Sequence, residues 1–186
     1  MATLRPTLLL RPVVAAAAAG LALAGCAAQP GTAATVNGVT ISENAVDDAT
    51  GEYVAFSGQE TAPVVILNTL VQAELLTPIA NEAGYAVSDA EVEQFFLEQA
   101  VMLGNAELPE NSSDAFIDLG RFLMQYNEVS SSPDAEAVLT QLGTELTEAD
   151  LEVNPRYGEL TEEGSIVPTT HEWIAQPTGE AAQPAG

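Results

Sequence analysis

The sequence predicts a mainly α-helical domain with a short strand at each end, and three observations lead to this fold class. Apolar residues recur at spacings of three and four in five stretches between residues 42 and 146, which is the period of an amphipathic helix. Residues 34–41 alternate β-branched residues around an Asn-Gly pair, the strongest short-range signal for a hairpin. Residues 151–153 also alternate and stop at Asn-Pro, which predicts a short strand that returns to the first one.

Composition limits the chemistry that the chain can perform. The 186 residues carry a formal charge of −23, with four arginines, no lysine and 27 acidic residues. Such a negative potential repels phosphate backbones, so we expect no nucleic-acid partner. The absence of lysine excludes Schiff-base chemistry and a phosphate-binding P-loop, and a single cysteine excludes an internal disulfide and a thiolate zinc cage. We therefore expect no cofactor and no metal. The length and the apolar content predict one domain with enough apolar residues for a core.

The first 25 residues have the pattern of an export signal. Residues 1–12 hold two arginines and no acid, and residues 13–25 form an uncharged apolar run. As a helix this run would span only about 20 Å, short of the roughly 30 Å hydrocarbon core of a bilayer. Residues 1–25 are therefore predicted to be a signal peptide that lies outside the fold.

The end of this run resembles the lipobox of bacterial lipoproteins. Leu23 and two small residues, Ala24 and Gly25, directly precede Cys26. The resemblance implies cleavage between Gly25 and Cys26, a thioether diacylglycerol and palmitate on Cys26, and a chain anchored at the extracytoplasmic face of the cell membrane. Lipid chains of this kind give a stable anchor. The alternative is an ordinary signal peptide in which Cys26 has no role.

The predicted elements begin after a flexible spacer at residues 26–33. Ser42 is expected to cap a helix that is interrupted by Gly51 and ends near Gly58. Residues 61–84 form the longest helical pattern, and Pro78 inside it is expected to kink or break the helix, giving two segments or one bent helix.

Three further helices are expected. Ser88 and Glu91 predict a capping box, followed by an amphipathic helix that ends at Gly104 and has the apolar face Val92, Phe95, Phe96, Gln99, Met102 and Leu103. Residues 114–129 predict a helix with the apolar face Phe116, Leu119, Leu123 and Tyr126. Pro133 opens the last helix, and residues 174–186 form a tail that can bury almost nothing.

Several of these motifs occur together in a family of chaperones. The segments ATVNGVTIS at residues 34–42, LNTLVQAELL at 67–76 and AGYAVSDAEVE at 83–93 resemble the N-terminal domain of the SurA, PrsA and trigger-factor group. LEVNPRYG at residues 151–158 resembles the returning strand of actinobacterial lipoproteins of this kind. The resemblance implies that residues 34–173 form a helical chaperone module that holds unfolded secreted polypeptides. Because only a tail follows residue 173, no parvulin domain and no prolyl isomerase activity are expected.

The candidate binding residues are aromatic and thioether side chains. Flexible and aromatic groups suit an apolar cradle for non-native chains, and the candidates are Phe95, Phe96, Met102, Phe122 and Met124. The alternative is that they are core residues, above all Phe95 and Phe96. Arg121 and Arg156, the two arginines after Cys26, are each expected to hold a carboxylate.

The sequence thus predicts a lipid-anchored, chaperone-like binder of unfolded or secreted polypeptides that is not an enzyme. The alternative is a structural or assembly lipoprotein that docks one envelope partner. A third reading, a small hydrolase or metal enzyme built around His171, is disfavoured because a lone histidine does not make a site.

Overall fold

The computed structural model describes residues 30–104 and 111–169, and this part of the chain is mainly helical, as predicted. The helices are α1 (Glu43–Ser57), α2 (Pro63–Glu82), α3 (Asp89–Leu103), α4 (Asp114–Ser130) and α5 (Ala135–Glu148). The strands are β1 (Thr32–Val36), β2 (Val39–Ser42), β3 (Leu151–Val153), β4 (Glu159–Leu160) and β5 (Ile166–Val167).

The predicted hairpin and returning strand are confirmed. Strands β1 and β2 are joined by Asn37 and Gly38, which both have positive φ, 49° and 85°, as a tight hairpin turn requires. Strand β3 pairs antiparallel with β1, so the sheet order is β2-β1-β3. The hairpin turn also contacts the start of β3, because Asn37 N–H donates to the Asp150 carbonyl over 2.9 Å. The first strand begins at Thr32, two residues inside the predicted spacer, and Ala33 is already fully buried.

Two helices are more continuous than the sequence predicts. Helix α1 starts at its cap Ser42 and ends at Gly58 as expected, but it is not interrupted at Gly51. Glycine costs about 1 kcal/mol inside a helix, and the burial of Val46 and Phe56 on either side offsets that cost.

Helix α2 passes through Pro78 as one helix, so the two-segment alternative is wrong. Proline removes one backbone hydrogen bond, and the buried residues Leu75, Leu76, Ile79 and Ala80 around it hold the helix together. By length and composition, α2 is also the one helix in the described residues that could cross a bilayer, and half of its apolar window is buried in the fold. It is a core helix, contacted by α1, α4 and α5.

The apolar face predicted for α4 is partly wrong. Phe116 and Leu119 are buried, but Leu123 and Tyr126 are almost half exposed. In their place Phe122 and Val129 are buried. Helix α4 contacts α1, α2, α3 and α5. Because four helices cover it, its buried residues extend beyond the single apolar face that the sequence period predicts.

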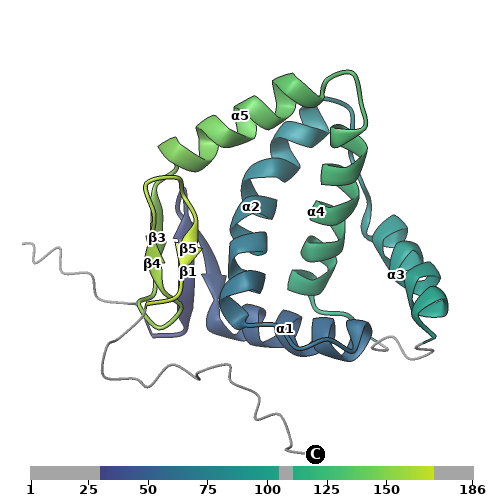
Figure 1. Ribbon diagram of the computed structural model, residues 1–186, viewed down its shortest axis with the longest axis horizontal. Helices are drawn as coiled ribbons and strands as arrows, with labels where there is room; N and C mark the ends of the chain where they lie inside the picture. Colours follow the sequence, from purple (N-terminus) through teal and green to yellow (C-terminus); the bar gives the residue numbers. More distant parts are fainter. Residues whose placement is uncertain (1–29, 105–110, 170–186) are drawn as a thin grey trace, which may run out of the picture.

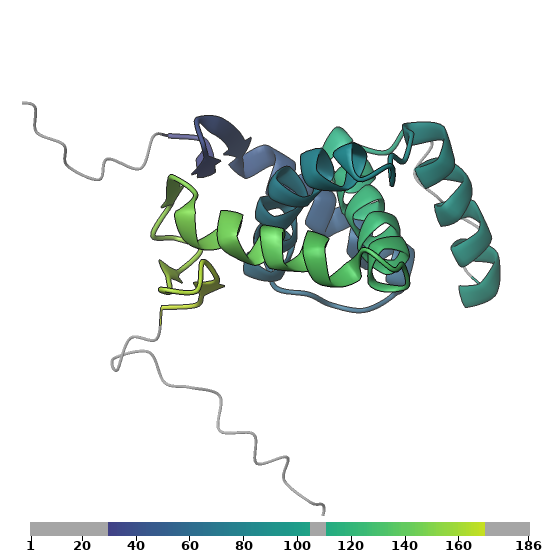
Figure 2. The same cartoon turned by 90° about the horizontal axis from the view of Figure 1, so that it is seen from above.

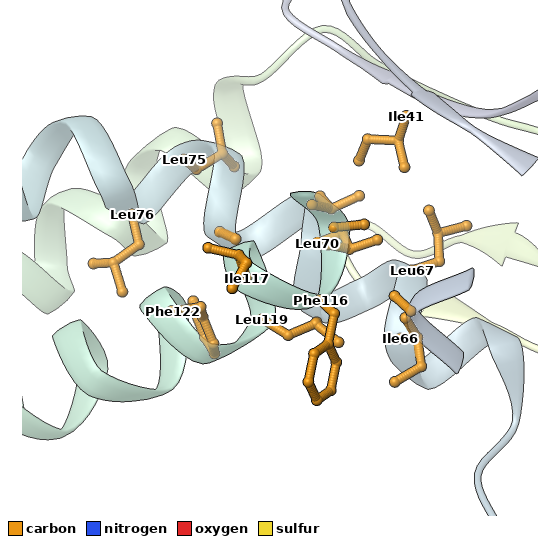
Figure 3. Packing of buried hydrophobic residues seen from close by; sticks show 14 of the residues in the cluster. Ile41, Ile66, Leu67, Leu70, Leu75, Leu76, Phe116, Ile117, Leu119 and Phe122 are labelled. Atoms are coloured by element: carbon orange, nitrogen blue, oxygen red, sulfur yellow. The ribbon is translucent and has the colours of Figure 1, made fainter. Parts of the chain in front are cut away.

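The strands gather at one end of the molecule, where they contact α1 and α2. Helices α2 and α4 lie side by side, α1 crosses one end of the pair, and α5 leads from the other end back to the strands (Figure 1). Figure 2 shows that α3 stands at the end of the molecule opposite the strands. The core lies between α2, α4 and the hairpin, where Ile41 lies on the side of Leu70 (Figure 3).

A second small hairpin, β4-β5, was not predicted. Its attachment to α2 is made by Asn68, whose side-chain amide donates to the Ile166 carbonyl over 2.7 Å and whose side-chain oxygen accepts from the Ile166 N–H over 2.8 Å. Strands of two residues carry too little periodicity to be recognised in a sequence.

Candidate functional site

The five candidate binding residues lie in different environments. Phe96 and Phe122 are buried in the core, Phe95 and Met124 are partly buried against it, and Met102 is exposed. The expectation that Phe96 and Phe122 face a ligand is corrected, because both rings are enclosed by neighbouring helices. Met102 on α3 is the exposed member of the set, and Phe95 on α3 and Met124 on α4 remain partly accessible.

The last two turns of α3 expose a cluster of large apolar side chains. Val101 is 79% exposed, Met102 73%, Leu97 57% and Leu103 50%. We call these four residues the α3 tip. One side of α3 packs on α4 and α1 through Val92, Phe96 and Ala100, whereas the side chains of the α3 tip are exposed. Exposed large apolar side chains gathered on one segment mark an interaction surface.

An aromatic cluster attaches α3 to the body of the protein. The rings of Phe96 on α3 and Phe116 on α4 stack with centroids 4.3 Å apart. Phe56 on α1 meets both rings edge to face, at 5.1 Å and 5.9 Å. Gly120 on α4 leaves the space that Val92 and Phe96 fill. Offset and edge-to-face ring pairs are favourable beyond their apolar burial, so this cluster holds α3 on the body of the protein through Phe96.

Arg121 fastens the N-terminal end of α3. Its guanidinium forms ion pairs with Asp118 on α4 and with Asp89 on α3, and it donates to the Val87 carbonyl over 3.3 Å. The predicted role of Arg121 in holding a carboxylate is confirmed. The capping box of Ser88 and Glu91 is also present, and the Ser88 hydrogen bonds lower the pKa of the Glu91 carboxyl.

A cleft of about 250 Å³ lies between β2, α2 and α4. We call it the β2 cleft. All four residues of β2 line it, together with apolar side chains and with Glu74, Asp114, Asp118 and Arg121. Burial raises the pKa of the Glu74 carboxyl, and the nearby Asp118 carboxylate raises this pKa further. The cleft is thus an acidic recess with an apolar floor.

Replacing Glu74 by glutamine is expected to stabilise the protein at neutral pH. A carboxyl whose pKa is raised in the folded state contributes most stability below its unfolded value, 4.5, and loses that contribution as pH rises through the folded value. Glu74→Gln should therefore raise the free energy of unfolding at pH values above the folded pKa, and this gain should disappear as the pH falls below 4.5. Urea unfolding at pH 7 and pH 4 measures it. Glu82→Gln, which removes an exposed carboxylate from the same helix, provides the baseline, and an equal gain at both pH values would contradict the prediction.

The chain turns a corner after β3, at residues 154–158, and this corner is held by Asn154 as well as by the predicted Arg156. Arg156 does bind a carboxylate, that of Glu43, over 3.2 Å, as predicted, but its side chain is largely exposed, and exposed ion pairs contribute little. Asn154 makes the more enclosed contacts. Its amide donates to the Thr32 carbonyl over 2.9 Å and to Glu43 over 3.1 Å, which joins the corner to the start of β1.

A buried glutamine, Gln125, was not predicted from the sequence. Gln125 on α4 is 0% exposed. Its amide donates to the Asn81 side chain over 2.9 Å and to the Tyr85 carbonyl over 3.0 Å, and its side-chain oxygen accepts from Thr77 over 3.2 Å. A buried amide with its donors and acceptors satisfied ties helices together specifically, and here it joins α4 to α2. Apolar periodicity gives no signal for such a residue.

Several predicted site residues fall outside the described part of the chain. These are Gly25 and Cys26, predicted for cleavage and lipidation; His171, which was disfavoured as a site, also lies outside it. The predicted signal peptide and tail also lie outside it. Within the described residues, no three His, Cys, Asp or Glu side chains are grouped closely enough to hold a metal ion.

Comparison of the chain with protein-family models, with curated proteins and with solved structures gives no match.

Proposed function

We propose that this protein is a lipid-anchored, extracytoplasmic, chaperone-like protein that holds unfolded or secreted polypeptides on apolar helical surface and catalyses no reaction. The observation that carries the proposal is the α3 tip, where four large apolar side chains are half or more exposed on a helix whose base is firmly packed. The motifs that resemble SurA-type chaperones support the same function. The lipobox-like sequence at Cys26 supports the anchor.

The physical basis of holding is burial of apolar surface. A client segment that covers the tip removes apolar area from water on both partners, at about 25 cal/mol per Å². Met102 is unbranched and polarisable, so it adapts to clients of different shape. The anchor would keep the tip close to polypeptides that emerge at the membrane, which raises their effective concentration.

Suppression of aggregation tests this function. The assay uses the chain from residue 26 onward with Cys26→Ser. This variant contains every described residue of the fold but carries no lipid. Two unrelated unfolded proteins, one basic and one acidic, are diluted from denaturant and their light scattering is followed. Protection of both supports the proposal. Protection of neither contradicts it and favours the alternative, a lipoprotein that docks one specific partner.

The tip variants test which surface does the holding. The double variant Val101→Gln, Met102→Gln is expected to reduce protection by about half or more, because it removes most of the apolar area that a client covers. Both side chains are exposed, so the urea midpoint should stay unchanged. Val65→Gln makes the same kind of change on α2, at a position that is 53% exposed, and should keep full protection. Equal protection by the double variant and the Val65 variant would place the holding surface elsewhere.

A further inference from the structure

The β2 cleft lies along the open edge of the three-stranded sheet. In that sheet β2 is an edge strand, since β1 pairs with it on one side only. All residues of β2 line the cleft and none of the described residues of β1 does, so the cleft opens on the unpaired side of β2. An edge strand presents N–H and C=O groups that can pair with an added strand.

The charges in the cleft favour a cationic occupant. Arg121 is held by Asp118 and Asp89, so its positive charge is already compensated. Within the described residues, Glu74 and Asp114 have no cationic partner, and both line the cleft. The floor beneath them includes Leu70, Ala73 and Ala115.

The occupant that fits is another polypeptide and not a second copy of this chain. After Cys26 the chain has two arginines and no lysine. Both arginines, Arg121 and Arg156, already form ion pairs with acids of their own chain. A second copy, with 27 acidic residues, would bring like charge to the cleft.

We propose that the β2 cleft binds an extended client segment that carries a lysine or arginine, with the backbone of the segment added to the edge of β2. The proposal rests on the polypeptide-holding function and names the class of client for it. Main-chain hydrogen bonds to β2 provide binding that is independent of sequence. The Glu74 carboxylate accepts a hydrogen bond from the cationic group of the client. The aliphatic part of the client's lysine or arginine side chain packs on Leu70 and Ala73.

Peptide binding tests this proposal with the same chain, residue 26 onward with Cys26→Ser. The probe is a fluorescein-labelled peptide of about ten alternating threonine and valine residues, long enough to form one strand, with one central arginine. A second peptide has glutamine in place of the arginine. A third keeps the arginine but is N-methylated at alternate residues, which removes the N–H donors on one edge. Fluorescence anisotropy at low salt gives the affinities.

The expected pattern separates charge from strand addition. Glu74→Gln should weaken binding of the arginine peptide by about tenfold, because a charge-assisted hydrogen bond is lost. Glu82→Gln, an exposed acid on the same helix, should change binding by less than about twofold. The glutamine peptide should bind the unmodified chain as weakly as the arginine peptide binds the Glu74 variant. The N-methylated peptide should lose binding.

Three results would overturn the inference: equal binding of the arginine and glutamine peptides, unchanged binding to Glu74→Gln, or full binding of the N-methylated peptide. Client protection is measured separately on the same samples. Protection without arginine-dependent peptide binding overturns the inference alone and leaves the holding function standing. Peptide binding without client protection overturns the holding function and leaves the cleft as a peptide site.

Discussion

Phe116→Ala is expected to lower the free energy of unfolding by about 3–5 kcal/mol, the range for removing a large buried aromatic side chain. Phe116 is 1% exposed and its ring contacts those of Phe96 and Phe56. Its removal therefore leaves a cavity where α1, α3 and α4 meet. Since small domains are stable by only about 5–15 kcal/mol, this one change should remove a large share of the total.

Urea unfolding followed by far-ultraviolet circular dichroism measures the effect, on the chain from residue 26 onward with Cys26→Ser. Phe116→Leu is the matched control. It keeps most of the apolar volume and loses the ring contacts, so it should cost about 1–1.5 kcal/mol. A cost below about 1 kcal/mol for Phe116→Ala would be outside the range for a buried ring and would show that the cluster is not closed in solution.

Gly120→Ala is expected to destabilise the protein by about 1–3 kcal/mol, although alanine is favoured over glycine inside a helix by about 1 kcal/mol. A Cβ atom at residue 120 would lie 2.4 Å from a Val92 methyl and 2.6 Å from the Phe96 ring. These contacts are too short, and both side chains are packed on their other sides, so α3 must move away from α4. Here the steric term outweighs helix propensity.

Gly143→Ala on α5 is the matched control, because a Cβ atom there meets nothing within 4 Å. It should stabilise the protein by about 0.5–1 kcal/mol. The two variants thus differ in sign for the same chemical change. Hydrogen exchange adds a local measurement: Gly120→Ala should speed exchange of the α3 amides, and Gly143→Ala should not. Stabilisation by both changes would mean that α3 does not pack on Gly120.

The contrast between α3 and α4 shows why the candidate site was only partly predictable. The apolar face of α3 runs from Val92 to Leu103 with regular spacing, so its members look alike in the sequence. The body of the protein covers Val92 and Phe96 and ends before Met102 and Leu103, which makes one face both core and exposed surface. On α4, Phe122 is buried because the helix has neighbours on several sides.

The β2 cleft could not be predicted from the sequence for a related reason. Thr40, Glu74 and Asp114 belong to three elements, and each looks unremarkable in its own segment. Only the packing of the hairpin across α2 and α4 brings them to one recess. Asn68 and Gln125 are similar, because the partners that satisfy their amides lie 40 or more residues away, apart from the Val64 carbonyl for Asn68.

The sequence by itself determined the local elements of this protein. The Asn-Gly turn, the caps at Ser42 and Ser88 and the helix ends at Gly58 and Gly104 are short-range interactions between residues that are close in the chain, and the structure has them all. The return of β3 to β1 was also predictable, because an isolated alternating strand at the end of a helical domain needs a partner.

Only the tertiary structure decided which parts of each apolar face are covered, whether α1 and α2 continue through Gly51 and Pro78, and which polar side chains meet. The physical reason is that burial depends on how far each neighbouring element extends, and that information is distributed over the whole chain. The exposure of the α3 tip and the acidity of the β2 cleft are both results of that packing.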